Sequence, residues 1–353
     1  MDLNNIVLIL VIIGFGLYFY KFFIVEIKKY NPELLVDSQF SKPQAFHEYS
    51  VSTSGGLCIY ISFLIVCINF LYFKNISYIE YFSFCSFFFI LGLGDDLKIN
   101  IKARIRLLLM FIFLLVLIKY NNFYLEKTGI DFLNNWIKNS KIFSLFFICL
   151  CFLFIINGAN LVDGYNGLLG IHSIIILLNL FFINYFAENN NLAHLILFFI
   201  IILITFLIFN FPKAKIFLGD SGSYLLGSFI AITVIKTSIA NPEISPFYFC
   251  IILFYLFFEV FFSFFRKLIK EKQSPINPDK KHLHMLLYKI LFKKNNNKLK
   301  SNYQVSIIIN SIYTILIIPA ILMMKNGFFC KYYSIIFILF YIFSYKAAYK
   351  KNK

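Results

Sequence analysis

The chain has 353 residues, of which 60% are hydrophobic and 14% charged, with a formal net charge of +16 at pH 7. So much apolar surface excludes an ordinary soluble domain, and long runs of Ile, Leu and Phe indicate many membrane helices. In a membrane protein a positive charge of this size is typical of cytoplasmic loops, so no nucleic-acid partner is expected.

Eleven apolar segments are long enough to cross a bilayer, because about 20 residues at 1.5 Å each span a core of roughly 30 Å. They lie at 4–25, 56–73, 78–94, 105–119, 141–157, 165–186, 192–210, 222–240, 246–265, 304–324 and 332–347. Most Lys and Arg residues face the cytoplasm if the N-terminus lies outside and the C-terminus inside. The sequence therefore predicts an all-α, polytopic membrane protein with a single domain over residues 1–353.

Five polar stretches interrupt the apolar pattern, and two predicted spans separate each stretch from the next. They are KPQAFHEYSVSTSGG (42–56), GLGDDLKINIKARIRL (92–107), NGANLVDGYNGLLG (157–170), NFPKAKIFLGDSGS (210–223) and SPINPDKKHLHML (274–286). An even number of spans returns the chain to the same side of the membrane. All five stretches therefore emerge on the basic, cytoplasmic face, where we expect the active site.

Four aspartates lie at helix ends on this face: Asp95, Asp96, Asp163 and Asp220. A single one can be an ordinary helix cap, but burying a carboxylate near lipid costs a few kcal/mol, so four together favour a function. Carboxylate and amide oxygens are the ligands that Mg²⁺ or Mn²⁺ prefers. Basic side chains would face the same space, namely Arg104, Arg106, Lys213, Lys215, His282 and His284. This pattern is typical of a site for a metal-bridged, phosphate-rich substrate.

The residues around Asp220 predict local structure as well. Gly219 and Gly222 are expected to leave room for metal and phosphate, and Ser221 and Ser223 to cap the following helix. Elsewhere, Glu259 lies inside a predicted span, seven residues before Arg266. An acid at that depth should face protein or a water-filled groove, where it is expected to help shape a substrate site.

Four of these strings resemble, in order, the motifs of the polyprenyl-phosphate N-acetylhexosamine-1-phosphate transferases, membrane enzymes that start lipid-linked glycan assembly. The strings are GLGDDLK, NGANLVDGYNGL, KIFLGDSGSYLLG and PDKKHLHML; the first loop, which holds His47, is similar to the family's first inner loop. The resemblance implies transfer of a sugar-1-phosphate from a UDP-N-acetylhexosamine to undecaprenyl phosphate, with release of UMP, at the bacterial inner membrane. Met285 stands where the peptidoglycan-precursor branch continues its histidines, which disfavours a muramyl-pentapeptide substrate.

The resemblance also implies roles for single residues. Asp220 would hold Mg²⁺, with Mn²⁺ as the alternative, and Asn160 would supply a second oxygen. Asp95 and Asp96 would position the acceptor phosphate or the metal, and Asp95 is the candidate base; Asp163 and Asn166 would organise the nucleotide pocket. The expected substrate-binding residues are Asn157, Asn160, Asn166, Lys213, Arg266, His282, His284, His47, Arg104 and Arg106, with the two histidines gripping the diphosphate. A homodimer is left open.

The rival interpretation is a membrane carrier or flippase for lipid-linked sugars. Such a protein would also have many spans and a few intramembrane charges. Carriers, however, bind substrate near the membrane midplane between structural repeats. Here the polar residues gather at one face and no repeat is visible, which favours an enzyme.

Overall fold

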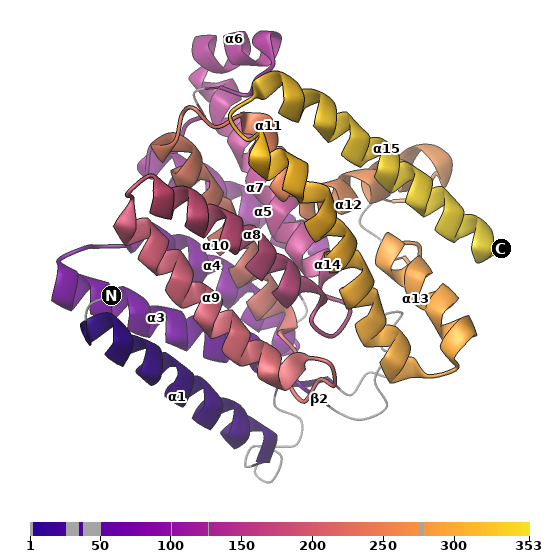
Figure 1. The fold of residues 1–353 in the computed structure, drawn as a ribbon, viewed down its shortest axis with the longest axis horizontal. Coiled ribbons are helices and arrows are strands. Elements are labelled where there is room, and N and C mark those ends of the chain that lie inside the picture. Colours follow the sequence, from indigo (N-terminus) through magenta and orange to yellow (C-terminus); the bar gives the residue numbers. More distant parts are fainter. Residues whose placement is uncertain (1–2, 26–34, 38–50, 100, 126, 275–278) are drawn as a thin grey trace.

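The protein consists of long helices that run roughly side by side (Figure 1). The computed structural model describes residues 3–25, 35–37, 51–99, 101–125, 127–274 and 279–353. Its helices are α1 (Leu3–Val25), α3 (Gly55–Lys74), α4 (Ile79–Asp96), α5 (Ala103–Tyr120), α6 (Asp131–Asn139), α7 (Lys141–Val162), α8 (Leu168–Phe186), α9 (Asn190–Asn210), α10 (Gly219–Ala240), α11 (Pro246–Ile252), α12 (Phe254–Phe265), the π-helix η1 (Arg266–Lys270), α13 (Leu283–Asn295), α14 (Lys298–Leu322) and α15 (Gly327–Lys351). The strands β1 (Val36–Asp37) and β2 (Val51–Ser52) pair antiparallel.

Every predicted span corresponds to a helix, or to the bent pair α11 and α12 in the case of the ninth. Among the described residues, eight helices are long and apolar enough to cross a membrane, or nine if the bent pair forms one span. The other two predicted spans are α4 and α5, which have 18 residues each and carry charged residues near both ends. The chain is therefore an all-α, polytopic membrane protein, while the count of eleven spans and their orientation stay predictions.

The bend between α11 and α12 measures 78° and is held by neighbouring helices. The amide of Leu256 donates to Leu253 O, so the Ile252 carbonyl lacks its usual helical donor. The Tyr313 hydroxyl, on α14, donates to this carbonyl instead. At Gly158 of α7 a Cβ would lie 2.1 Å from the Leu256 oxygen, so only glycine permits this approach. Because lipid offers no hydrogen bonds, a broken helix needs such internal partners.

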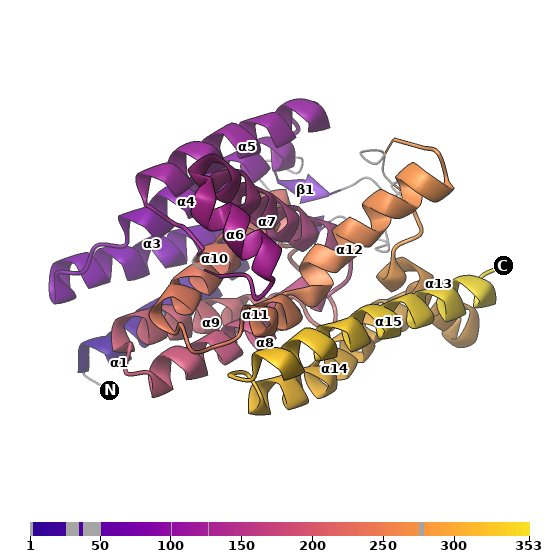
Figure 2. The ribbon, with the colours of Figure 1, turned by 90° about the horizontal axis from the view of Figure 1, so that it is seen from above.

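The helices form layers around α10. Seen from above, α10 and α7 lie between α3, α4 and α5 on one side and α14 and α15 on the other (Figure 2). Accordingly α10 is the most deeply buried candidate span, and α15 the least buried. The polar start of α10 therefore projects from the centre of the bundle, where several helix ends can surround it.

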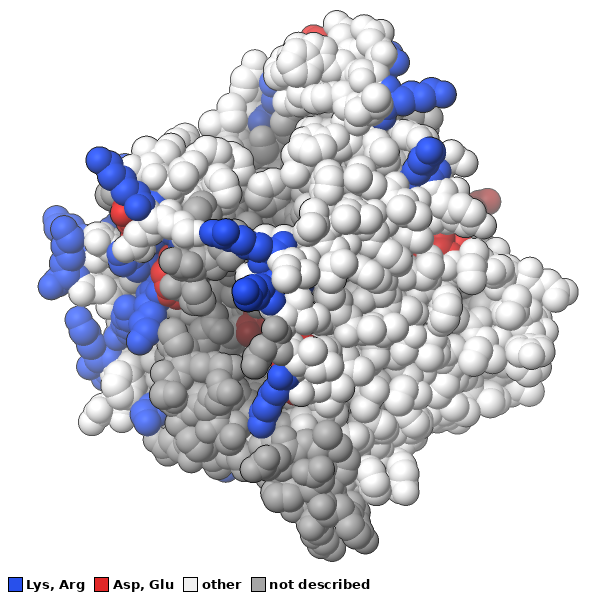
Figure 3. All heavy atoms as spheres, turned by 180° about the vertical axis from the view of Figure 1, so that it is seen from behind, with Lys and Arg blue, Asp and Glu red and all other residues white. Residues whose placement is uncertain are grey.

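Charge is distributed unevenly over the surface. On the face drawn in Figure 3, most Lys and Arg gather toward one side, whereas a broad area carries no charged residue. Many large apolar side chains on the span helices are exposed, among them Ile142 and Leu322. An exposed apolar belt with basic residues at its edge is typical of a protein solvated by lipid.

Two short helices were not foreseen from the sequence. The amphipathic helix α6 lies at the end of the molecule opposite β2 (Figure 1). Helix α13 begins within the histidine motif and packs against α14 and α15. It lies in a stretch rich in lysine that was interpreted as a solvated basic loop, so no helix was predicted there.

The orientation can be tested with reporter fusions. We expect a reporter after Lys353 to read cytoplasmic and one inserted near Asn122, between α5 and α6, to read external, because the predicted topology places most Lys and Arg on the side of the C-terminus. A third reporter in the turn at Asn296, between α13 and α14, should also read cytoplasmic. An external signal at Asn296 would contradict the single-face arrangement.

Candidate active site

The candidate site lies at the start of α10, where three helices meet backbone to backbone. A Cβ at Gly56 of α3 would lie 2.3 Å from the backbone nitrogen of Gly222. A Cβ at Gly92 of α4 would lie 2.4 Å from the backbone oxygen of Asp220. The space beside Gly222 is itself filled, because a Cβ there would lie 2.5 Å from Leu218 Cδ1. The expectation that Gly222 leaves room for phosphate is therefore wrong: these glycines allow the helices to approach closely.

The polar segment before α3 joins this contact. Ser52 forms a parallel bridge with Ile216, and the amides of Gly55 and Gly56 donate to the backbone oxygens of Phe217 and Leu218, at 3.0 and 2.8 Å. The first and fourth polar stretches are therefore adjacent in space. His47, the predicted substrate contact of the first stretch, lies outside the described residues.

Asp96 caps α10. Its Oδ1 accepts from the Asp220 amide at 2.9 Å, and its Oδ2 accepts from the Ser221 amide at 3.0 Å and from the Ser221 hydroxyl at 2.5 Å. Gly219 has a φ of 77°, and a Cβ there would lie 2.6 Å from Asp96 Oδ2. A carboxylate at a helix N-terminus satisfies orphan amides and favours the helix dipole.

This cap differs from the predicted one. Ser221 and Ser223 were expected to cap the helix, but the Ser221 hydroxyl donates to Asp96 and the Ser223 hydroxyl donates to Asp220 O at 3.1 Å. The capping group comes instead from α4, 124 residues away in sequence. Asp96 therefore helps to fix the position of Asp220 through the hydrogen bond from the Asp220 amide.

Asp95 forms an ion pair with Arg106, on the first turns of α5. The Arg106 guanidinium also lies 5.6 Å from the centre of the Tyr224 ring, on α10. The pair thus joins the second polar stretch to α10 from the side. Arg104, another predicted contact, is exposed near the start of the same helix, and Lys213 is exposed in the loop before α10.

The end of α7 brings Asp163 and Asn160 to the same place. Asn160 Nδ2 donates to Asp220 Oδ1 at 2.8 Å and to Ser223 Oγ at 2.9 Å. Burial, followed by the charges of Asp220 and Asp96, raises the pKa of Asp163 to about 8. In the described part of the chain, no hydrogen bond or ion pair reaches the Asp163 carboxyl. The predicted convergence of the four aspartates is confirmed, while their catalytic roles stay predictions.

The donor set of this cluster suits Mg²⁺. It offers carboxylate, amide and hydroxyl oxygens, and Arg106 is the one cation that pairs with it among the described residues. Those residues contain no group of three or more His, Cys, Asp or Glu side chains placed to hold a metal. Mg²⁺ usually takes one or two carboxylates and completes its shell with water and substrate phosphates, so a preformed cage is not required. In this arrangement Asn160 donates its amide N–H to Asp220, and the metal contact through its oxygen stays a prediction.

Two other asparagines that were predicted to bind substrate form hydrogen bonds with backbone carbonyl groups. Asn157 Nδ2 donates to Leu153 O at 2.8 Å, within α7. Asn166 Nδ2 donates to Pro212 O at 2.9 Å, and the Asn166 amide donates to Asn302 Oδ1 of α14 at 2.9 Å. Asn166 thus connects its turn to α14 and to the loop before α10. The substrate contacts of both residues stay predictions.

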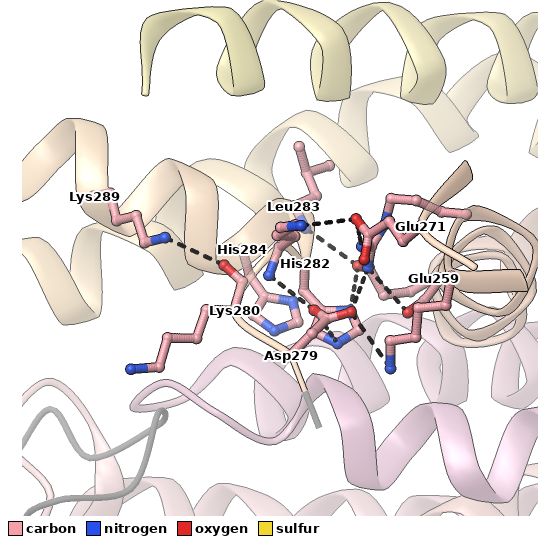
Figure 4. A network of polar contacts seen from close by, with 12 residues as sticks. Glu259, Glu271, Asp279, Lys280, His282, Leu283, His284 and Lys289 are labelled. Carbon is pink, nitrogen blue, oxygen red and sulfur yellow. Dashed lines mark hydrogen bonds and ion pairs between the residues drawn. The ribbon is translucent and has the colours of Figure 1, made fainter. Parts of the chain in front are cut away.

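The histidine motif lies at the start of α13 and is buried (Figure 4). His282 Nδ1 lies 3.0 Å from Glu259 Oε1, and His284 Nδ1 lies 3.2 Å from the Tyr255 hydroxyl. Burial lowers the pKa of His284 to about 4, so its ring is neutral at pH 7. The His284 ring also packs on Tyr165 with centroids 5.7 Å apart, which places this motif beside the turn that follows Asp163.

The two histidines were predicted to bind the diphosphate, but their rings are buried against other residues of the protein. His282 is 5% exposed and His284 is not exposed at all, so neither ring is open to solvent. Arg266, predicted beside them, pairs with Glu271 at 2.8 Å and with Asp279 at 2.6 Å. Contacts of these three residues with substrate therefore stay predictions.

Comparison with known proteins identifies the family. The sequence profile described as glycosyl transferase family 4 matches residues 78–238, from α4 into α10. An undecaprenyl-phosphate alpha-N-acetylglucosaminyl 1-phosphate transferase of Thermotoga maritima is 31% identical over 238 residues, which cover 67% of this chain and 68% of that relative. The chain belongs to glycosyl transferase family 4. The family suggested by the motifs is thus confirmed, and the matched segment contains all four aspartates.

Other relatives of this chain carry two different names. A phospho-N-acetylmuramoyl-pentapeptide-transferase of Dictyoglomus turgidum is 35% identical over 191 residues, covering 53% of this chain and 59% of the relative. An undecaprenyl-phosphate alpha-N-acetylglucosaminyl 1-phosphate transferase of Escherichia coli O157:H7 is 25% identical over 255 residues, covering 70% and 67%. Identity alone therefore does not select one sugar.

Sequence reasoning missed the aromatic residues around the histidine motif. Tyr165 lies inside the predicted string NGANLVDGYNGL and could have been noticed as a polar aromatic at a conspicuous turn. Tyr255 and Tyr341 lie in helices rich in Phe and Tyr, where nothing in the pattern sets them apart. Only the folded chain shows that their hydroxyls meet His284 and Glu259.

Proposed function

We propose that this protein transfers a sugar-1-phosphate from a UDP-N-acetylhexosamine to undecaprenyl phosphate and releases UMP. One observation carries the proposal: the aspartates of three polar stretches converge on the N-terminus of α10, in a chain whose family includes polyprenyl-phosphate sugar-1-phosphate transferases. The expected setting is the bacterial inner membrane. The product would be the lipid-linked diphosphate sugar that starts a cell-surface glycan.

The reaction requires alignment of the acceptor phosphate with the donor and neutralisation of the phosphate charges more than it requires a strong base. An oxygen of the acceptor phosphate attacks the phosphorus attached to the sugar, and the bond to UMP breaks. A phosphate monoester has a second pKa near 6, so the acceptor is mostly ionised at neutral pH. Arg106 can attract the incoming phosphates, and the amides at the start of α10 supply partial positive charge.

A metal site is part of the proposal. Mg²⁺, when bound, would neutralise charge on the diphosphate. We expect Asp220 to hold it, with Asp163 or Asn160 as a second oxygen donor. The raised pKa of Asp163, caused by burial and then by Asp220 and Asp96, fits a carboxyl that lacks a positive partner until a cation arrives.

A carrier function is less well supported. The polar cluster lies at one end of the helices rather than at mid-membrane, and its members belong to stretches of a transferase family. A phospho-N-acetylmuramoyl-pentapeptide substrate is the closer competitor, because a relative bears that name. Against it stands Met285, which follows His284 where a further histidine would mark that branch.

A donor panel tests the function. Purified protein with undecaprenyl phosphate and Mg²⁺ should release UMP from at least one UDP-N-acetylhexosamine, while an Asp220→Asn preparation provides the background. Turnover with UDP-muramyl-pentapeptide alone would reject the proposed sugar class but keep the reaction class. If every donor fails while lipid-linked sugars are transported in vesicles, the protein is a carrier.

A further inference from the structure

Glu259 is a buried carboxylate that receives three hydrogen-bond donors. It lies on α12 and is 1% exposed. Its Oε1 faces His282 Nδ1 at 3.0 Å and accepts from the Leu283 amide at 3.2 Å, while its Oε2 accepts from the Tyr341 hydroxyl at 2.6 Å. Burying a carboxylate costs free energy unless hydrogen bonds compensate for the lost water. The three donors around Glu259 supply such bonds, and the carboxylate in turn fixes the positions of these donors.

The groups that Glu259 holds come from two other helices. The His282 ring and the Leu283 amide form the start of α13, and no side-chain cap from His282 itself supports that helix end. Tyr341 belongs to α15, the least buried candidate span. A single carboxylate therefore connects the bent span, the histidine motif and the C-terminal helix.

The far side of the His282 ring is held as well. Its Nε2 lies 3.5 Å from Asp279 Oδ1, and Asp279 in turn binds Arg266 and the Lys281 amide, the latter at 2.8 Å. Burial alone would raise the pKa of Asp279, but the neighbouring His282 ring, the Lys281 amide and Arg266 outweigh burial and lower the pKa to about 2. The ring also stacks on His284, with centroids 5.5 Å apart and planes 8° apart. His282 thus has one orientation, fixed from both sides.

We propose that Glu259 and Tyr341 form a positioning pair for His282, in which α15 sets the orientation of the histidine motif through one hydroxyl. The inference rests on the proposed transferase function. A carboxylate on Nδ1 fixes the tautomer and the plane of an imidazole. The Tyr341 hydroxyl occupies the second oxygen of Glu259 and prevents the carboxylate from rotating away. The proposal includes no contact of either residue with substrate; both act by orienting His282.

A matched pair of tyrosines on α15 provides the test. Tyr341→Phe removes the hydroxyl that binds Glu259, whereas Tyr345→Phe, one turn later, removes a buried hydroxyl with no hydrogen-bond partner among the described residues. We expect Tyr341→Phe to lower kcat/KM for the UDP-sugar about tenfold, the size of one hydrogen bond to a charged group. Tyr345→Phe should stay within about twofold of the wild type, since it breaks no such bond. Equal effects of the two variants would overturn the proposal.

A double-variant comparison separates positioning from general packing. Glu259→Gln should lower kcat/KM by about a hundredfold in the wild-type background, because it removes the charge from all three contacts and turns one acceptor oxygen into an N–H donor. In a His282→Ala background the same change should have almost no further effect, because the group it positions is gone. Independent, multiplicative losses would mean that Glu259 acts on something other than His282.

The chemical reactivity of His282 tests the positioning pair even if the protein lacks the proposed transferase activity. Diethyl pyrocarbonate modifies unengaged imidazole nitrogens, and mass spectrometry locates the modified residue. His282 should react slowly in the wild type and in Tyr345→Phe, and several times faster in Tyr341→Phe and Glu259→Gln. If wild-type protein releases no UMP from any donor, the function fails while this measurement still tests the pair. Unchanged His282 reactivity in both variants would reject the pair.

Discussion

Asp220→Asn should reach the membrane at wild-type levels yet release almost no UMP at any Mg²⁺ concentration. The amide oxygen of asparagine can still accept from Asn160 Nδ2, and the backbone amide of residue 220 can still donate to Asp96. An amide is also cheaper to bury than a carboxylate, so folding should suffer little. What disappears is the negative charge at the centre of the acidic cluster. Losing one anionic metal ligand should cost several kcal/mol of transition-state stabilisation, or a rate fall of about a thousandfold or more.

The measurement is UMP release by purified protein over a range of Mg²⁺ concentrations. Asp131→Asn is the control, because it makes the same change at an exposed position that starts α6. It should leave the rate unchanged. Near-normal turnover of Asp220→Asn would mean that Asp220 serves only the helix end, and the metal would then have to be sought at Asp95, Asp96 or Asp163.

The long apolar helices and the meeting of the polar stretches could be predicted from the sequence because both follow from simple physics. Apolar runs of about 20 residues become helices in lipid, since no other structure satisfies the backbone there. Counting spans then decides which loops share a face. The distant residues Asp96 and Asp220 were placed together by this argument alone, and the amide of Asp220 does donate to Asp96.

The local roles of these residues could not be predicted in the same way. Gly222 and the serines after Asp220 were interpreted from their neighbours in sequence, which suggested space for phosphate and a local cap. The actual cap, Asp96, comes from another helix, and the space at Gly222 is filled by Leu218 and by α3. Contacts between helices depend on crossing geometry, which a linear pattern does not contain.

The histidine motif shows the same limit. A polar loop with two histidines suggested solvent-facing phosphate ligands. In the structure His282 lies between Glu259 and Asp279, and His284 is enclosed by aromatic rings. The prediction that Glu259 faces protein was correct, but its three partners include Tyr341, for which the sequence of α15 offers no signal.

Gly92→Ala should disrupt the site from the other side of the contact. A Cβ at position 92 would lie 2.4 Å from the Asp220 oxygen and 2.5 Å from Ser221 N, both backbone atoms that cannot move aside alone. The helices α4 and α10 must therefore separate or twist, which displaces Asp220 from Asp95 and Asp96. Overpacking of this kind typically costs about 1–3 kcal/mol of stability. A misplacement of about 1 Å in a catalytic group lowers the rate by about a hundredfold.

Gly94→Ala is the matched control, two residues later on the same helix. A Cβ there meets only Ile101 Cδ1, at 3.8 Å, which is ordinary contact. Both substitutions gain about 1 kcal/mol of helix propensity, so any difference between them reports the contact with α10 and not the backbone of α4. We expect thermal unfolding in detergent and UMP release to change strongly for Gly92→Ala and little for Gly94→Ala. Equal tolerance at both positions would mean that α4 and α10 do not need this close approach, and that the cap from Asp96 alone sets the position of Asp220.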